Sequence, residues 1–392
     1  MKTWLILLSF LLLAGCAAPT PRGLPPLSQL FRDAEFGAPT ERISADDVFT
    51  LSPAMLDYAH SNALARQMRT RGLEQGLLEA LYKKGELKLD YDATMTRTAA
   101  QAFDARSGNC LSLVIMTAAF AKEFGIDVEY HTVLVDPSWS REGAFYFASS
   151  HVNLSLKVGK ADRLRGISAT GQSLTVDFLG GSDLDHFQSL SLDEDSIVAM
   201  FMNNRAAETL AQDRLADAYW WARAAIERNP SLVIAYNTLG VIYQRHGNAA
   251  QAERVFNTAL VREPENTTLL QNLVPVLAAL GKPEESLALA ARMRSIEPNP
   301  PFYFFNLGRN ALERGDLKAA KALFAREVKR APYYHEFHFW LAVTNWRLGE
   351  AEAARDELRL AAETSTTRDN SRRYSAKLAH LRGLKPVPSE TY

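Results

Sequence analysis

Cysteine is scarce in this sequence, because the 392 residues contain only Cys16 and Cys110. A small fold held together by several disulfides is therefore excluded. The sequence also lacks a cysteine pair of metal-binding spacing, a His-Glu-x-x-His motif and an acidic loop of the calcium-binding type, so we expect no metal site. It has no glycine-rich loop of the kind that holds a phosphate group, and we expect no cofactor.

A surplus of charge is absent as well, because 44 Lys and Arg residues are balanced by 45 Asp and Glu residues. Nucleic-acid-binding domains carry a basic excess, so we expect no nucleic acid partner. Hydrophobic residues make up 47% of the chain, and at this length they are enough for two or more packed units.

Long apolar runs are absent except near the N-terminus, where one covers residues 4–14. This run is too short to cross a bilayer as a helix, and it has the length of the hydrophobic part of a secretory signal. It ends in Leu13-Ala14-Gly15-Cys16, which resembles the signal of bacterial lipoproteins. The resemblance implies that residues 1–15 are a signal peptide and that Cys16 is lipidated. An ordinary secretory signal with a chance cysteine is the alternative.

The lipoprotein resemblance also implies a location. A residue other than Asp directly after the lipidated cysteine, here Ala17, is typical of proteins of the outer membrane. We therefore expect an exported protein that is held at the bacterial outer membrane by its lipid and faces the periplasm. Four prolines lie between residues 17 and 26, so we expect residues 16–44 to form a flexible tether.

Prolines and glycines recur with one period in the second half of the sequence. Neighbouring members of each set are 34 residues apart: Pro230, Pro264, Pro298 and Pro332, and Gly247, Gly281, Gly315 and Gly349. This is the period of tetratricopeptide repeats, in which two amphipathic helices are joined by a turn. The glycine suits the turn and the proline ends the second helix. We expect an all-α repeat solenoid of about five repeats over residues 196–368, then a closing helix and tail over 369–392.

Two repeats depart from this pattern. Asp213 lies where the first repeat should have its turn glycine. Pro275 lies inside a predicted helix, where we expect a kink.

Repeats of this kind stack so that the first helix of each pair lines a concave face that binds proteins or peptides. On the repeat pattern, six aromatic and basic residues are expected along this face: Phe302, Phe305, Arg309, Phe339, Trp346 and Arg347. The alternative is that the aromatic residues fill the space between neighbouring repeats. A protein or peptide partner on the repeat face is the expectation.

The first half of the chain, residues 45–195, mixes predicted helices and strands, so we expect an α+β domain that folds on its own. A strongly apolar helix is predicted directly after Cys110, over residues 111–124. Strands are predicted over 128–135, 151–158 and 174–179. Strict alternation in the second of these places His151 at the start of the polar face of a half-buried strand.

Two stretches of this half, Thr98-Ala99-Ala100-Gln101-Ala102-Phe103 and Arg106-Ser107-Gly108-Asn109-Cys110, resemble the transglutaminase-like (papain-related) superfamily. In that superfamily a Cys opens a helix, a His begins a strand, and an Asp lies on the next strand. The resemblance covers about residues 50–190 and implies a transglutaminase-like fold. It implies Cys110 as the nucleophile, His151 as the base and Asp177 as the residue that orients the imidazole. The Trp-rich segment usual around the His and the Asp is missing.

The residue types suit such chemistry. A thiol at a helix N-terminus lies at the positive end of the helix dipole, which stabilises the thiolate. A nearby imidazolium stabilises it further, and a carboxylate fixes the tautomer of the ring. His131 and His186 compete with His151 for the role of base, and Asp136 competes for that of the carboxylate. The alternative for Cys110 is an inert buried thiol.

Three functions follow from these patterns. The one we favour is a Cys-His-Asp enzyme that acts on peptide or amide bonds through a thioester, as a cysteine peptidase or an acyl transferase, with the repeats recruiting substrate. The second is a catalytically inactive transglutaminase-like fold that serves as a protein-interaction scaffold. The third is a redox or thiol sensor that uses Cys110 alone.

Overall fold

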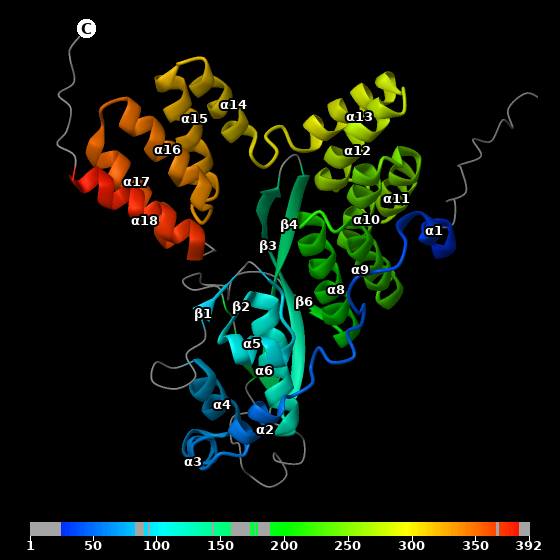
Figure 1. The fold of residues 1–392 in the computed structure, drawn as a ribbon, viewed down its shortest axis with the longest axis vertical. Coiled ribbons are helices and arrows are strands. Elements are labelled where there is room, and N and C mark those ends of the chain that lie inside the picture. Colours follow the sequence, from blue (N-terminus) through cyan, green and yellow to red (C-terminus); the bar gives the residue numbers. More distant parts are fainter. Residues whose placement is uncertain are drawn as a thin grey trace, which may run out of the picture.

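The computed structural model describes residues 25–82, 90–92, 95–142, 145–157, 173–176, 178, 189–365 and 368–383. Within these residues, a region of helices and strands is followed by a long series of helix pairs (Figure 1). The expected lipidation site Cys16 lies outside the described residues, as do Asp177 and His186.

The central helix of the first region is the apolar helix α6 (Cys110–Glu123). The other helices of this region are α2 (Pro53–Ala59), α3 (Asn62–Arg71), α4 (Leu73–Tyr82) and α5 (Ala99–Ala105). Every residue of α6 from Leu111 to Ala121 is buried, because neighbouring helices and the sheet cover it on all sides. The predicted apolar helix after Cys110 is therefore confirmed, and Cys110 is its first residue.

A four-stranded antiparallel sheet lies against α6. In spatial order its strands are β5 (Leu174–Val176), β4 (Phe145–Lys157), β3 (Asp127–Glu142) and β6 (Ser189–Leu192). A separate short parallel pair joins β1 (Asp90–Tyr91) to β2 (Ser107–Gly108). Strands β3 and β4 form a long hairpin that rises from the sheet toward the repeats, where β4 contacts α12 (Figure 1).

The prediction that β4 is half-buried is wrong. His151, Asn153 and Ser155 are each only 5% exposed, and the alternating apolar residues Val152, Leu154 and Leu156 are buried as well. The polar face is tied to the neighbouring strands: Ser155 Oγ lies 3.2 Å from His131 Nε2 and 3.0 Å from Thr175 Oγ1. Strand β4 therefore contributes a buried polar face rather than a solvated one.

The second region consists of five helix pairs and a closing helix, as predicted. The pairs are α8 (Glu194–Ala211) with α9 (Leu215–Arg228), α10 (Val233–His246) with α11 (Ala249–Arg262), α12 (Thr267–Ala279) with α13 (Pro283–Ile296), α14 (Tyr303–Glu313) with α15 (Leu317–Arg330), and α16 (His335–Arg347) with α17 (Ala351–Glu363). Helix α18 (Arg368–Gly383) closes the series. The turn glycines Gly247 and Gly349 have φ of 89° and 80°, and Asp213 takes up the same left-handed conformation with φ of 60°.

The solenoid is interrupted between α13 and α14, which was not predicted. Most buried apolar residues of α8–α12 belong to one core shared with the sheet and α6, whereas a second core forms around Phe302, Phe305 and Phe324 at α14–α16. The segment Pro298-Asn299-Pro300-Pro301 connects the two stacks (Figure 1). Only Ser286 of α13 is buried, and Leu287 is 70% exposed, so α13 lacks the cover that a continuous stack would give it.

The expectation of a flexible tether is wrong for residues 27–41. From Leu27 to Glu41 the chain forms η1 (Leu27–Gln29), α1 (Asp33–Phe36) and a loop that follow the surface of α9–α11; we call residues 27–41 the strap. Leu30 is fully buried, and the ring of Phe36 stacks on that of Tyr219 with centroids 4.0 Å apart. Burial of these two apolar side chains holds the strap against the repeats.

Candidate functional site

Cys110 lies where a tight turn delivers the chain into α6. Arg106 ends α5 in the left-handed conformation, with φ of 50°. At Gly108 a Cβ would lie 2.7 Å from Cβ of Ser112, so only glycine fits there. The side chain of Asn109 caps the helix: its Oδ1 accepts hydrogen bonds from Ser112 N at 2.9 Å and Ser112 Oγ at 2.8 Å. The half-buried thiol thus lies at the positive end of α6.

The structure brings the helix that carries Cys110 against the strand that carries His151, since α6 packs on β4. Strand β5, which ends at Val176, pairs with β4, so the expected Asp position directly follows the strand next to that of His151. The competing His131 lies on β3 and contacts Ser155 on β4. The competing Asp136 falls in the register shift of β3 between Val133 and Ser138.

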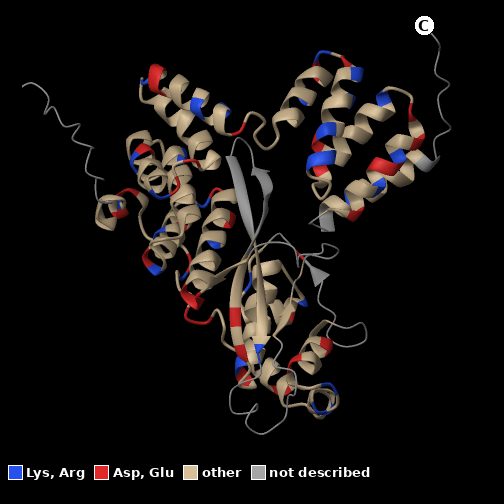
Figure 2. Cartoon of the chain, turned by 180° about the vertical axis from the view of Figure 1, so that it is seen from behind, with Lys and Arg blue, Asp and Glu red and all other residues tan. Residues whose placement is uncertain are grey.

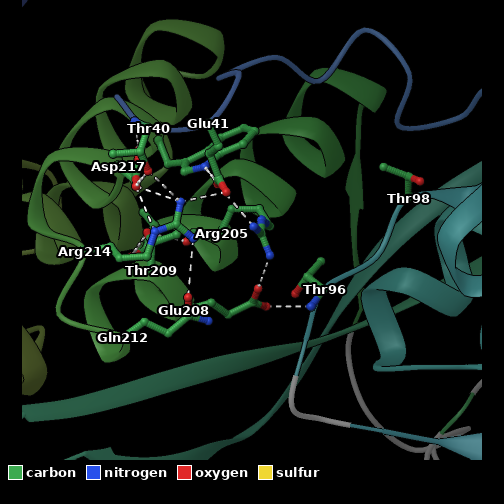
Figure 3. A network of polar contacts seen from close by, with 12 residues as sticks. Thr40, Glu41, Thr96, Thr98, Arg205, Glu208, Thr209, Gln212, Arg214 and Asp217 are labelled. Carbon is green, nitrogen blue, oxygen red and sulfur yellow. Dashed lines mark hydrogen bonds and ion pairs between the residues drawn. The ribbon is translucent and has the colours of Figure 1, made fainter. Parts of the chain in front are cut away.

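A polar network connects the turn before α6 to the first helix pair of the repeats. Figure 3 shows the part of it that runs from Thr96 through Glu208 into the repeats and residues 40–41. The side chain of Asn109 donates from Nδ2 to Thr96 Oγ1 at 2.8 Å. Thr96 in turn donates its backbone N–H to Glu208 Oε1 on α8 at 2.6 Å, and its hydroxyl oxygen accepts from Asn204 Nδ2 at 3.2 Å. Burial raises the pKa of Glu208, and the hydrogen bonds from Thr96 together with the charge of Arg205 offset this only in part.

The same network continues into the strap. Arg205 forms ion pairs with Glu208 at 2.9 Å and with Glu41 at 3.2 Å. Arg214 lies between Glu41, at 2.8 Å, and Asp217, at 2.7 Å. Asp217 also accepts hydrogen bonds from the N–H and hydroxyl of Thr40, both at 2.6 Å. Burial by itself would raise the pKa of Asp217, but these hydrogen bonds and Arg214 outweigh it and lower the pKa.

The six residues expected on the concave face divide into two groups. Phe302 and Phe305 are 1% and 0% exposed and lie in the core of the second stack. They pack against neighbouring helices and are not available to a partner. The other four remain partly or fully accessible. Phe339 stacks on Tyr374, Arg309 lies 3.9 Å over the ring of Trp340, Trp346 is half-buried and Arg347 is exposed.

Sequence reasoning missed a groove of about 600 Å³ at the break between the stacks. It lies between the Pro298–Pro301 connection, the start of α14 and the end of α15, and its lining includes Phe304, Arg326, Arg330, Tyr333 and Tyr334. The guanidinium of Arg326 lies 3.6 Å over the ring of Phe304, and Tyr333 is 44% exposed. Three prolines in four residues were the signal that the repeat pattern changes here.

A buried carboxylate supports this groove. Glu327, fully buried, accepts hydrogen bonds from the N–H groups of Phe304 at 2.9 Å and Phe305 at 3.4 Å, at the beginning of α14. Arg330 pairs with Glu327 at 3.3 Å and donates to the carbonyls of Asn299 and Pro300. Burial raises the pKa of Glu327, against the lowering effect of Arg330. The groove wall is thus tied to the connection between the stacks.

Basic and acidic residues are interspersed along the described helices (Figure 2). Among the described residues, no group of three or more His, Cys, Asp or Glu side chains is placed to hold a metal ion. None of the helices in this described part is both long and apolar enough to cross a membrane.

Comparison with known proteins concerns the helical region. A family model of the tetratricopeptide repeat matches residues 237–301 and 305–369, whereas no curated protein matches the chain. Three solved structures are similar to part of this chain. They are YrrB, a TPR protein with an unusual peptide-binding site (23% identity, TM-score 0.25, 45% of this chain and 92% of that one); PilF of Pseudomonas aeruginosa (19%, 0.29, 49% and 96%); and PilW, a type IV pilus biogenesis factor (20%, 0.27, 50% and 97%). The family match supports a tetratricopeptide-repeat solenoid over the C-terminal helices.

Proposed function

We propose that the protein is an envelope lipoprotein whose repeats bind a protein partner in the groove between the two stacks. The groove carries the proposal, because it combines an accessible cavity of about 600 Å³ with exposed tyrosine and arginine side chains. Tyr and Arg are among the residues that dominate binding energy at protein interfaces. A lipid on Cys16 would hold this scaffold at the outer membrane, facing the periplasm.

The test is site-specific photo-crosslinking in the native cell envelope. A photoreactive phenylalanine analogue replaces Tyr333 in the groove, or Val261, which is 58% exposed on α11 and serves as the control. We expect a discrete protein adduct at position 333 only, and its loss when Arg326→Ala is added. Equal adducts at both positions, or none at 333, would contradict the groove as the binding site.

A second candidate function is thiol catalysis in the first region, and the observation that favours it is the half-buried Cys110 at the capped start of α6, against the strand of His151. In this scheme the thiolate attacks the carbonyl carbon of a peptide or amide. The C–N bond breaks, and the leaving amine takes a proton from the protonated imidazole of His151. Water or an amine then attacks the thioester, which releases an acid or a new amide and returns the thiol. Asp177 would orient the imidazole.

The thiol is tested by the rate of Cys110 alkylation by iodoacetamide as a function of pH. The comparison is between the native protein and His151→Ala, with His131→Ala on the neighbouring strand as the matched control. We expect alkylation to stay fast well below pH 8.5, the ordinary thiol value, and to collapse only in His151→Ala. A thiol that reacts only after denaturation, or that ignores His151, would leave the scaffold function alone.

A further inference from the structure

We infer that two side chains of the first repeat helix, Asn204 and Glu208 on α8, position the start of α6 and with it the Cys110 thiol, acting through Thr96. The inference deepens the second candidate function and rests on it for its chemical consequence. Asn204 and Glu208 are positioning residues, since their contacts reach Cys110 only through other groups.

Thr96 is the connecting residue. It is 1% exposed and lies between α6 and α8. Its hydrogen bonds are made to α8 and to Asn109, the cap residue of α6. Its backbone N–H binds Glu208, while its hydroxyl oxygen accepts from both Asn109 and Asn204. The following residue, Arg97, donates its N–H to Ser112 Oγ at 2.8 Å, so the segment is fixed to the first turn of α6 at a second point.

Asn109 carries the effect to the thiol. Its amide nitrogen is held by Thr96, and this orients its Oδ1 toward Ser112 N and Oγ in the first turn of α6. Removal of the Thr96 hydroxyl leaves a part-buried amide without that acceptor, so the cap geometry is no longer fixed. Because Cys110 lies between the cap residue and the capped N–H, loosening the cap moves the thiol relative to the helix dipole.

Glu208 is itself held by the repeats and the strap. Its second carboxylate oxygen pairs with Arg205, which also pairs with Glu41 of the strap. A partner that shifts α8, or a strap that detaches, therefore changes the environment of Cys110. This provides a route by which binding to the repeat region alters thiol reactivity.

Two measurements on the full-length protein in detergent test the inference. One is hydrogen exchange of the amides in the first turn of α6, at Ser112 and Leu113. The other is the pH profile of Cys110 alkylation by iodoacetamide. The variants are Thr96→Val, which replaces the hydroxyl by a methyl group, and Glu208→Ala. Thr96→Ser keeps the hydroxyl, and Glu208→Gln keeps an oxygen that can accept the hydrogen bond from Thr96 N–H but loses the ion pair with Arg205. Glu253→Gln, in the ion pair with Lys282 at 2.7 Å elsewhere in the repeats, is the matched control.

We expect Thr96→Val and Glu208→Ala to lower protection of the α6 start by about fivefold, the effect of losing a helix cap. We expect the alkylation profile to move to higher pH, with recovery in Thr96→Ser and Glu208→Gln and no change in Glu253→Gln. Unchanged protection and an unchanged profile in the first two variants would overturn the inference. Lost protection together with an ordinary, His151-independent thiol in the native protein would uphold the positioning and reject catalysis.

Discussion

Single residues set the spacing of the repeat helices, and Gly240 shows this most directly. It lies within α10, where a Cβ would lie 2.6 Å from the ring of Phe256 on α11. Gly308 has the same relation to Phe324 on α15, at 2.8 Å. Because both rings are fully buried, they cannot move aside without opening the core. The two helix pairs, one in each stack, therefore pack through the same glycine–phenylalanine contact.

We predict that Gly240→Ala destabilises the first stack by about 1–2 kcal/mol, since overpacking outweighs the gain in helix propensity. Urea unfolding of the purified protein measures the change. The double variant Gly240→Ala, Phe256→Leu should lose less free energy of unfolding than the two single variants lose together, because the smaller side chain at position 256 makes room for the methyl group. Strict additivity would show that the two positions do not clash.

The buried carboxylate of Asp217 predicts an acid-sensitive strap. The pKa of Asp217 in the folded protein is lowered from the ordinary 3.8. Its contribution to the free energy of unfolding is therefore complete above about pH 4 and is lost as the pH falls through the pKa of the folded state. Asp217→Asn should cost about 2 kcal/mol at pH 7, because charge-assisted hydrogen bonds to Thr40 and Arg214 are lost. The difference in Tm between native protein and variant should shrink below pH 4. Asp316→Asn, at the cap of α15, is the control; a constant difference across pH would contradict the prediction.

At the scale of elements, the sequence predicts what depends on regular spacing. The helix pairs follow from the 34-residue period, and α6 follows from an unbroken apolar run after Cys110. The strap was not predictable in this way, because its docking depends on isolated residues that meet distant parts of the chain. Phe36 stacks on Tyr219, and the carbonyl of Leu30 accepts a hydrogen bond from Tyr243. Burial of the polar face of β4 was missed for a similar reason, since alternation marks two faces but does not say what covers them.

The candidate site also has features that the sequence pattern predicts and features that it does not. Cys110 at the start of a helix could be derived from the Gly-Asn-Cys turn and the apolar run. The groove could not, because it arises where the repeat packing fails, and the concave-face pattern that selected Phe302 and Phe305 presumes that packing continues. The link from α8 to Thr96 depends on long-range hydrogen bonds that leave no periodic signal.

The separate core of the second stack predicts separate unfolding. Phe324 is fully buried in that core, so Phe324→Ala should destabilise α14–α18 by about 3–5 kcal/mol. Hydrogen exchange should then rise in residues 303–383 while residues 189–296 keep their protection. Phe256→Ala is the matched change in the first stack and should give the reverse pattern. Loss of protection in both stacks from either variant would indicate one cooperative unit.

At the scale of the whole molecule, the sheet region and the first stack share one hydrophobic core, which runs from Leu30 to Leu277. A domain boundary near residue 195, as the sequence suggested, would cut through this core and remove the α8 contacts of Thr96. We predict that a fragment of residues 27–195 aggregates, whereas one of residues 27–299 melts cooperatively. Thermal melting followed by circular dichroism distinguishes these outcomes, and a cooperative melt of the shorter fragment would contradict the shared core.

The docked strap has a consequence for reach. If residues 16–44 were free, they would allow the folded part to travel about 100 Å from a lipid on Cys16, at roughly 3.5 Å per residue. Because the strap is fixed from Leu27 onward, a lipid on Cys16 would be separated from the packed part by eleven residues, which span at most about 40 Å. A protein anchored in this way would stay within a thin layer next to the membrane and would reach only partners that are themselves at that surface.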